Sequence, residues 1–500
     1  MILALLLAGS SVGVRRSEFK TCAQSGFCGR QRAYAELTAA KQTLEATFSV
    51  VPGSWTFSDA IVTANVMGID PADVFVAVFS FAQTHINFRL TLRNASLTAD
   101  PFEKQTPSNA VCETREGLVV CTSQNNVLTI HSSPFRWSIA HNGTEAVAWN
   151  SLNNLYVETP RERSDTGKEP AFSVAKNDQY DALRSELVAN YWQETFNNHI
   201  DEKPNGPNSV GFDVVFPGAQ HTYGIPEHAS SFALKDTRGP DASYSDPYRL
   251  YNLDVFEYEL DNPMALYGSI PFMMAHKSGQ TTAILWMNAA EMWIDIQKAP
   301  EGTQTHWMAE TGSINMFIFL GPTQSDIFNA YTALSGRPQL PQEFAIAYHQ
   351  CRWNYKDQDD VLQVDQNFDK HNIPYDVLWL DIEHTNGKRY FTWDAEKFPE
   401  PEQMQDNLAS KGRKMVTIVD PHLKKDSTYA VSSEALAQNL FVRTQSGSVF
   451  DGYCWPGDSN WLDYTNIEAR KFWASKFTYD QYLGSTPNLY TWNDMNEVKS

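Results

Sequence analysis

The sequence predicts a multidomain chain in which an antiparallel β-sandwich is followed by the first half of a (β/α)8 TIM barrel. At 500 residues, the chain exceeds the size of one ordinary domain. Short strand signals separated by Pro, Gly and Asn clusters fill the region from about 44 to 316. After Pro341, strands alternate with helices. The first pattern is typical of a sandwich, and the second of parallel strands joined by crossover helices.

In the first region, apolar residues recur at or near alternate positions within short runs. The runs that indicate strands are 74–81, 88–92, 127–130, 209–216, 250–259 and 281–287, and a polar stretch at 159–169 indicates a loop. A helical pattern at 323–334 precedes Gly336-Arg337-Pro338, which indicates a domain boundary. We therefore assign residues 15–322 to the sandwich and 323–340 to a linker.

Residues 341–500 form the predicted barrel portion, with about four strands. Strands are expected at 344–348, 375–380, 414–419 and 488–492, and helices at 359–371, 401–411 and 467–483. The long interval between the third and fourth strands leaves room for an insertion near 427–461.

Composition and charge exclude some classes of function. The formal net charge of −20 argues against nucleic acid, whose phosphates need a basic surface. The apolar run Ile2–Leu7 is too short to span a bilayer, so residues 1–14 are predicted to be a signal peptide. No later segment predicts a membrane span. The acceptor triplets at Asn94 and Asn142 are glycosylation candidates that fit a secreted or lumenal protein.

Six cysteines bear on the redox compartment. Two pairs lie close in sequence and are disulfide candidates, which would suit an oxidising compartment: Cys22 with Cys28, and Cys112 with Cys121. The alternative is that all six are free thiols. Cys351 and Cys454 lie in apolar, aromatic stretches and are interpreted as buried thiols.

Each predicted strand after Pro341 is followed by carboxylates or by a polar and aromatic cluster. In strand order, these residues are His349, Cys351, Arg352 and Trp353; Asp381, Glu383 and His384; Asp420; and Asn493, Asp494, Asn496 and Glu497. The C-terminal strand ends of a (β/α)8 barrel form its active site, so we expect these side chains to meet. A single Asp in such a place can instead cap a helix, and that alternative stays open for Asp420.

Clustered carboxylates with nearby tryptophans suit glycoside hydrolysis. One carboxylate stabilises or attacks the oxocarbenium-like centre, and a second carboxyl protonates the leaving oxygen. Further carboxylates hold sugar hydroxyls through charge-assisted hydrogen bonds. A metal site is the competing interpretation, but the interleaved tryptophans favour a sugar: Trp353, Trp379, Trp455 and Trp492.

At these residues the sequence resembles glycoside hydrolase family 31. The run Trp492–Glu497 (W-N-D-M-N-E) resembles the nucleophile signature W-x-D-M-N-E-P, and further family segments follow in the expected order: Arg352-Trp353, Trp379–Ile382, Ile418–Pro421 and Trp455–Gly457. The segments 223–229, 251–256, 262–268, 381–384 and 388–393 are similar to a branch of the family that trims glucose from N-glycans in the endoplasmic reticulum. The resemblance is strong from about 209 to 497 and thin from 33 to about 201.

The resemblance implies the role of each site residue. Asp494 would be the nucleophile of a retaining α-glucosidase, with Glu497 supporting its loop, and Asp381 would bind hydroxyls of the terminal glucose. Asp420 would be a supporting or hydroxyl-binding carboxylate. The pocket would be lined by Ile382, Ile418, Trp455, Trp492 and Met495, with Trp353 as a wall. The first domain would be galactose-mutarotase-like.

The resemblance also sets expectations beyond the site. The family's acid/base Asp would lie beyond the nucleophile motif, so we expect it to be absent from this chain and the chain to be inactive by itself. Val498 stands where the signature has Pro. The substrate would be an N-glycan oligosaccharide, the partner a lectin-like β subunit, and the location the endoplasmic reticulum lumen; the mechanism needs no metal or cofactor. A lysosomal-type α-glucosidase, an α-xylosidase and a non-catalytic sugar-binding fragment remain alternatives.

Overall fold

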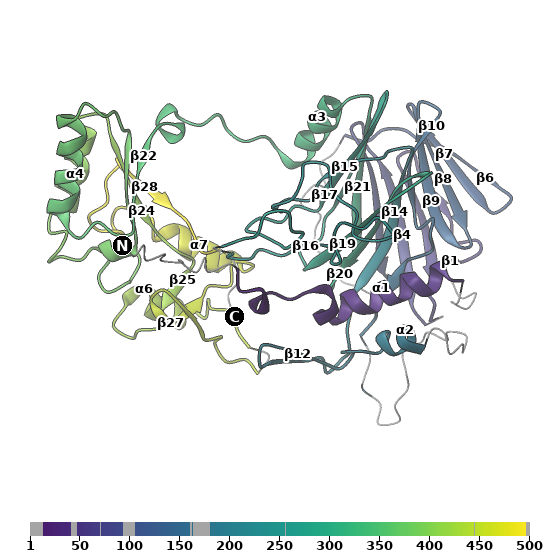
Figure 1. Cartoon of the computed structure of the whole chain (residues 1–500), viewed down its shortest axis with the longest axis horizontal. Coiled ribbons are helices and arrows are strands. Elements are labelled where there is room, and N and C mark those ends of the chain that lie inside the picture. The colour runs from purple at the N-terminus through teal and green to yellow at the C-terminus, as the bar shows by residue number, and fades with distance from the viewer. Residues whose placement is uncertain are drawn as a thin grey trace, which may run out of the picture. The chain divides into compact units, whose positions relative to one another are not determined.

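The protein is described by a computed structural model that covers residues 14–41, 48–70, 72–93, 106–160, 163, 181–255, 257–444 and 446–496 (Figure 1). The chain divides into two compact units, residues 1–337 and 338–500. The predicted signal peptide lies almost entirely outside the described residues, as do Asn94, Glu497 and most of the predicted loop at 159–169.

The first unit is built on two large antiparallel sheets. Within the described residues, one sheet has the order β1 (Ser49–Val50), β3 (Ile61–Met67), β4 (Val74–Phe81), β5 (Ile86–Leu92), β21 (Ile314–Gly321), β18 (Gln280–Trp286), β17 (Phe272–Lys277) and β15 (Thr222–Gly224), with β2 (Thr56–Phe57) paired to β3. The other has the order β16 (Tyr248–Leu250), β19 (Met292–Ala299), β20 (Gly302–Ala309), β14 (Val210–Pro217), β10 (Thr144–Trp149), β9 (Phe135–His141), β8 (Asn126–Ser132), β7 (Leu118–Ser123) and β6 (Val111–Arg115), with β11 (Tyr156–Val157) paired to β14. A separate hairpin pairs β12 (Gln193–Phe196) with β13 (His199–Glu202).

The alternating sequence pattern forms the core between these sheets. In β4 every second side chain is buried, as period-two patterning requires. Trp137 and Trp149 stack at 5.7 Å between ring centroids within the core. Five of the six predicted strands are confirmed by β4, β5, β8, β14 and β18. The strand predicted at 250–259 is wrong, because β16 ends at Leu250 and the chain then leaves the sheet.

Helix α1 (Gly26–Ala39), which the sequence analysis did not predict, packs on this unit (Figure 1). Two short 3-10 helices precede it, η1 (Arg16–Glu18) and η2 (Cys22–Gln24), and α2 (Asp181–Glu186) contacts it. Arg30 donates from Nε and one terminal nitrogen to Glu158 at 2.7 and 2.9 Å, and both side chains are buried. A second ion pair joins Arg32 to Asp295 at 3.0 Å. These contacts fix α1 to the sheet.

Both predicted disulfides are present. Cys22 bonds to Cys28 across the start of α1, and Cys112 bonds to Cys121 between β6 and β7. The prediction of buried thiols is wrong for Cys351, which is exposed, and Cys454 is only partly buried. Both residues follow strands or precede tight turns, where an apolar neighbourhood in sequence does not ensure burial.

Helix α3 (Gln324–Ser335) ends the first unit. Its Ile327 and Leu334 pack against Phe317 and Phe319 of β21, and Thr323 caps it. The segment predicted as a linker therefore begins with a helix of the first unit, and the division between units falls after Arg337.

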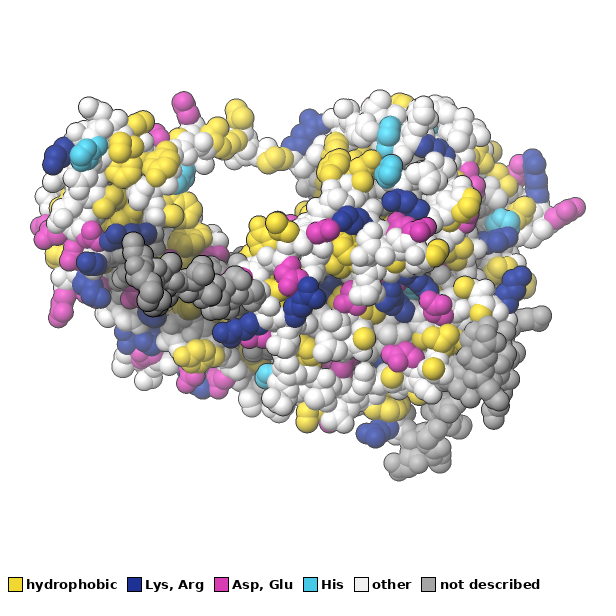
Figure 2. Space-filling view, viewed as in Figure 1, with side chains coloured by type: hydrophobic (Ala, Val, Ile, Leu, Met, Phe, Trp, Pro, Cys, Tyr) yellow, Lys and Arg dark blue, Asp and Glu magenta, His cyan; other side chains and the backbone are white. Residues whose placement is uncertain are grey.

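The second unit contains a parallel sheet with the order β22 (His349–Gln350), β23 (Val377–Leu380), β24 (Lys414–Ile418) and β28 (Leu489–Trp492). Helices α4 (Gln358–Lys370), α5 (Pro401–Ala409) and α7 (Ile467–Ser475) alternate with these strands. The cluster around Leu378, Met404 and Met415 forms the core between the sheet and its helices. Figure 2 shows hydrophobic side chains on the visible face beside α4.

Two details of the second unit differ from the prediction. Residues 344–348 are not a strand: η4 (Glu343–Ile346) is an exposed 3-10 helix, and the strand begins at His349. Helix α7 ends at Ser475 rather than 483. The apolar residues of 344–348 indicated a buried strand, but apolar content does not separate a short exposed turn from such a strand.

The predicted insertion between the third and fourth strands has its own structure. It holds a small antiparallel sheet with the order β25 (His422–Lys424), β27 (Gly457–Trp461) and β26 (Gly452–Cys454), and helix α6 (Ala430–Ala437). In the described part of the whole chain, no helix is long and apolar enough to cross a membrane.

Candidate active site

The register of the parallel strands brings three predicted carboxylates to one edge of the sheet. Leu380 of β23 pairs with Thr417 of β24, and Ile418 pairs with Trp492 of β28. Asp381 follows β23 directly, while Asp420 and Asp494 each lie two residues beyond the end of their strand. The strand ends are therefore level, as the prediction of a shared acidic edge required.

Asp381 and Asp494 lie close enough for their charges to interact. Asp381 begins the 3-10 helix η5 (Ile382–His384), and its Oδ1 accepts a hydrogen bond from the Ile382 amide at 2.6 Å. Burial raises the pKa of Asp381, and the neighbouring charges of Asp494 and Glu383 raise it further. Both Asp381 and Asp494 stay partly exposed, so they are accessible to a ligand.

Asp420 lies behind this edge. Its side chain is 0% exposed, and its Oδ2 accepts a hydrogen bond from the Tyr390 hydroxyl. The same hydroxyl lies 3.1 Å from His422 Nε2, and burial together with the Asp420 charge raises the pKa of Tyr390 far above its ordinary value. This burial favours the supporting role for Asp420 over direct binding of sugar hydroxyls.

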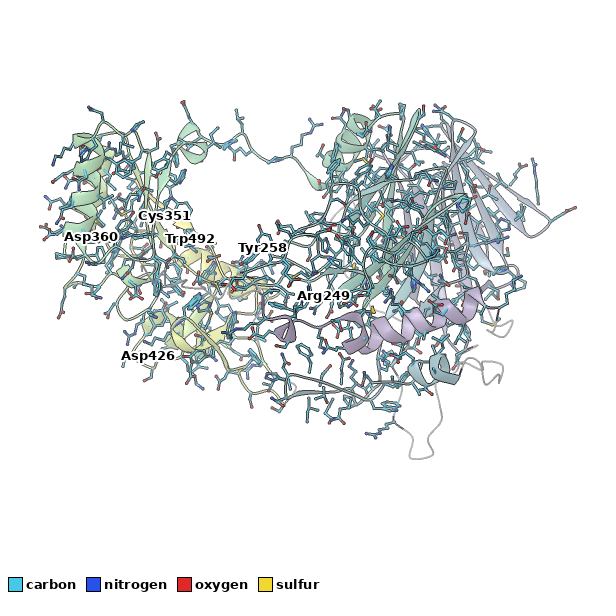
Figure 3. The ribbon with its side chains drawn as sticks, viewed as in Figure 1. Arg249, Tyr258, Cys351, Asp360, Asp426 and Trp492 are labelled. Carbon is cyan, nitrogen blue, oxygen red and sulfur yellow. A yellow bond between two sulfur atoms is a disulfide. The ribbon has the colours of Figure 1, made fainter. Side chains whose placement is uncertain are left out.

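Apolar side chains lie within two residues of these carboxylates in the sequence. Ile382 and Ile418 are buried in one cluster, against which Trp492 packs, and Met495 is buried immediately after Asp494. Figure 3 marks Trp492 at the end of β28, and its ring lies 5.2 Å from that of Trp379. Trp353 and Trp455 are 72% and 56% exposed, so both side chains are accessible from solvent.

A hydrogen-bonded chain beneath Asp381 was missed by the sequence analysis. His384 Nδ1 lies 2.8 Å from the Asp381 carbonyl oxygen, and its Nε2 lies 3.1 Å from the Tyr482 hydroxyl. That hydroxyl lies 3.3 Å from Thr417 Oγ1 of β24. Burial lowers the pKa of His384 to about 4. His384 belongs to a segment that carried the family resemblance, but nothing in the sequence connected it with Tyr482, 98 positions away.

Other predicted sites have simpler surroundings. Asn142 lies exposed in the turn between β9 and β10, so its glycosylation stays a prediction. Within the described ranges, no group of three or more His, Cys, Asp or Glu side chains is arranged to hold a metal ion.

With this geometry, comparison with known proteins decides the family. Residues 338–500 match the glycosyl hydrolases family 31 TIM-barrel domain, and residues 75–295 match the glycosyl hydrolase 31 N-terminal galactose mutarotase-like domain. The chain belongs to glycoside hydrolase family 31.

Relatives within the family agree with this assignment. A probable glucan 1,3-alpha-glucosidase of Arabidopsis thaliana is 41% identical over 97% of this chain and 54% of its own length. Human neutral alpha-glucosidase AB is 40% identical over 99% of this chain and 56% of its own length. A crystal structure of the ER glucosidase II heterodimeric complex, of catalytic subunit and regulatory-subunit binding domain, aligns with a TM-score of 0.87 and 37% identity, covering 96% of this chain and 55% of that one. The chain thus spans about half the length of the relatives it matches.

Proposed function

We propose that this chain carries the nucleophile and the glucose-binding carboxylate of a retaining α-glucosidase, within the first half of a (β/α)8 barrel. The observation that carries the proposal is the shared position of Asp381 and Asp494 beyond level strand ends, close enough that Asp494 raises the pKa of Asp381. A carboxylate pair among apolar and aromatic side chains suits a sugar ring with polar edges.

In this proposal Asp494 attacks the anomeric carbon and forms a covalent glycosyl-enzyme. Asp381 accepts hydrogen bonds from the hydroxyls of the terminal glucose, and the negative charge of its carboxylate strengthens these bonds. Trp492, Ile382 and Met495 exclude water from the reacting centre. Trp455 lines the glucose pocket with Ile418, and Trp353 forms its wall; aromatic rings of this kind suit contact with a sugar ring. Glu497, which is not among the described residues, supports the nucleophile loop.

The chain by itself is proposed to be inactive on ordinary glucosides. Retaining hydrolysis needs a second carboxyl that protonates the leaving oxygen. Among the described carboxylates near the site, Asp420 is fully buried against Tyr390, Glu383 faces Lys388 at 3.8 Å, and Asp381 binds hydroxyls. Within the described residues β22 and β28 are the edge strands of the parallel sheet, and such edges fit a barrel that further strands complete.

We propose the endoplasmic reticulum lumen as the location and N-glycan glucose as the substrate. Two disulfides suit an oxidising compartment. The similar glucosidase II structure is a heterodimer with a regulatory subunit's binding domain, so a lectin-like β subunit is the proposed partner.

Sugar binding by the 500-residue chain tests the proposed pocket. Isothermal titration with glucose and with xylose, which lacks the hydroxymethyl group, should show tighter binding of glucose. Asp381→Ala should abolish binding, while Asp406→Ala, which removes an exposed carboxylate on α5, should leave it unchanged. Equal binding of xylose would favour an α-xylosidase, and glucose binding that survives Asp381→Ala would overturn the proposed subsite.

A further inference from the structure

His384 has both ring nitrogens engaged in a buried setting, and this fixes its tautomer. The Asp381 carbonyl oxygen only accepts, so Nδ1 at 2.8 Å must carry the proton and donate. In a neutral ring Nε2 is then the acceptor, so the Tyr482 hydroxyl at 3.1 Å donates to it. The Tyr482 oxygen in turn accepts from Thr417 Oγ1 at 3.3 Å. The hydrogen bonds run in one direction, from β24 to the Asp381 backbone.

This row of hydrogen bonds joins three segments that are distant in sequence. Thr417 belongs to β24, Tyr482 lies beyond the end of α7, and His384 closes η5. The Asp381 side chain accepts from the Ile382 amide at 2.6 Å, while the Asp381 carbonyl is held by His384. One hydrogen bond therefore holds the Asp381 side chain, and another holds the Asp381 backbone carbonyl.

Aromatic rings pack against this row of hydrogen bonds and exclude water from it. Trp393 lies 4.9 Å from the His384 ring, edge to face, and Phe391 lies 5.7 Å from the Tyr482 ring. Hydrogen bonds shielded from water in this way hold geometry more firmly than exposed ones, and a positively charged imidazole would be costly here.

We propose that His384, held neutral with its proton on Nδ1 by Tyr482 and Thr417, is a positioning residue that sets the Asp381 carboxylate for sugar binding. The inference rests on the proposed function only in taking glucose as the ligand of Asp381. His384 itself touches no substrate, because it lies buried beneath the turn that bears Asp381.

Four variants of the full chain separate positioning from stability. Tyr482→Phe removes the donor to Nε2 and keeps the ring. His384→Asn places an amide NH near Nδ1 and keeps the bond to the Asp381 carbonyl, whereas His384→Gln reaches toward Tyr482 and loses that bond. Phe391→Leu is the control, since it reduces the packing against Tyr482 but removes none of the hydrogen bonds that link β24 to Asp381.

The first readout is the tautomer itself. Nitrogen-15 NMR of the protein with labelled histidine should show His384 as the neutral Nδ1–H form at pH 6 to 8. An ordinary histidine would change its charge within this range. Carboxyl carbon-13 spectra should show a changed chemical shift for the Asp381 side chain in Tyr482→Phe and His384→Gln, but not in Phe391→Leu. An Nε2–H tautomer, or an Asp381 carboxyl signal that no variant moves, overturns the proposal.

The second readout is the dissociation constant for glucose. Losing one buried hydrogen bond predicts about fivefold to tenfold weaker binding in Tyr482→Phe, a larger loss in His384→Gln and near-parent binding in His384→Asn. Phe391→Leu should lower the melting temperature and leave the dissociation constant unchanged; equal weakening in Phe391→Leu overturns the proposal. If the parent chain binds no glucose, the proposed function fails, and the NMR readouts still decide the positioning role.

Discussion

Replacing Tyr390 by Phe tests whether the buried Asp420 carboxylate supports the edge of the sheet that bears the site. The Tyr390 hydroxyl donates to Asp420 Oδ2 and also contacts His422. Asp420 is 0% exposed, so water cannot replace the lost donor in the native structure. Hydrogen bonds to charged groups contribute about 1.5–3 kcal/mol to stability. We therefore expect a loss of about 2–3 kcal/mol.

A matched control uses the neighbouring tyrosine. The Tyr429 hydroxyl donates to the Tyr390 backbone carbonyl at 2.8 Å, and both tyrosines are buried. Tyr429→Phe removes the same atom from a neutral hydrogen bond, so it should cost only about 1 kcal/mol. The difference between the two variants isolates the effect of the buried charge.

Hydrogen exchange is the suitable assay, because unfolding of a chain with two units is not one two-state transition. In peptides covering β24, Tyr390→Phe should reduce amide protection roughly 30- to 150-fold, since each 1.4 kcal/mol corresponds to about tenfold. Peptides from β4 in the first unit should be unchanged. Equal losses in Tyr390→Phe and Tyr429→Phe would refute the argument that a buried carboxylate depends on this hydroxyl.

Three further predictions concern the first unit. Arg30→Met removes the cation that pairs with the buried Glu158 carboxylate and leaves it only the hydroxyl donors Tyr156 and Ser209. It should cost about 3–5 kcal/mol by hydrogen exchange of α1, with a smaller loss when Glu158 is also made apolar. Cys28→Ser opens the short loop closed by Cys22 and should cost about 2 kcal/mol, measured the same way; unchanged protection of α1 would count against this. Burial lowers the pKa of His306 well below its ordinary value of 6.5, so below that pH the unfolded chain binds a proton that the folded chain refuses. The contribution of His306 to the stability of the first unit should therefore fall as pH decreases below about 6.5, and His306→Gln should flatten the pH dependence of the exchange-derived stability of β20 between pH 7.5 and 5.

Much of the fold could be predicted from periodicity. Alternation in 74–81 marked β4 with the bounds that the structure has, and the helical spacing after Pro341 marked α4 and α5. Helix α1 was missed because its amphipathic pattern is weak: its buried side includes Arg30 and Gln31. Their partners, Glu158 and Ser209, lie far away in sequence next to β11 and β14. Contacts of this kind have no local signal in the sequence.

The candidate site divides in the same way. Asp381 and Asp494 could be predicted, because the residues after parallel strands meet at one edge of the sheet. The supporting contacts could not. Tyr390 and Tyr482 gain their significance only from their partners Asp420 and Thr417, which lie 30 and 65 positions away in sequence.

Covalent trapping of the nucleophile tests the central claim most directly. A 5-fluoro-α-glucosyl fluoride carries a leaving group that departs without protonation, so it reacts even where no acid/base residue acts. Incubation with the 500-residue chain, followed by proteolysis and mass spectrometry, should find one fluoroglucosyl group on the peptide that contains Asp494. Asp494→Asn should remain unlabelled, and Asp406→Asn should label like the parent. A label on another carboxylate, or a folded chain that binds glucose and never labels, would contradict the account.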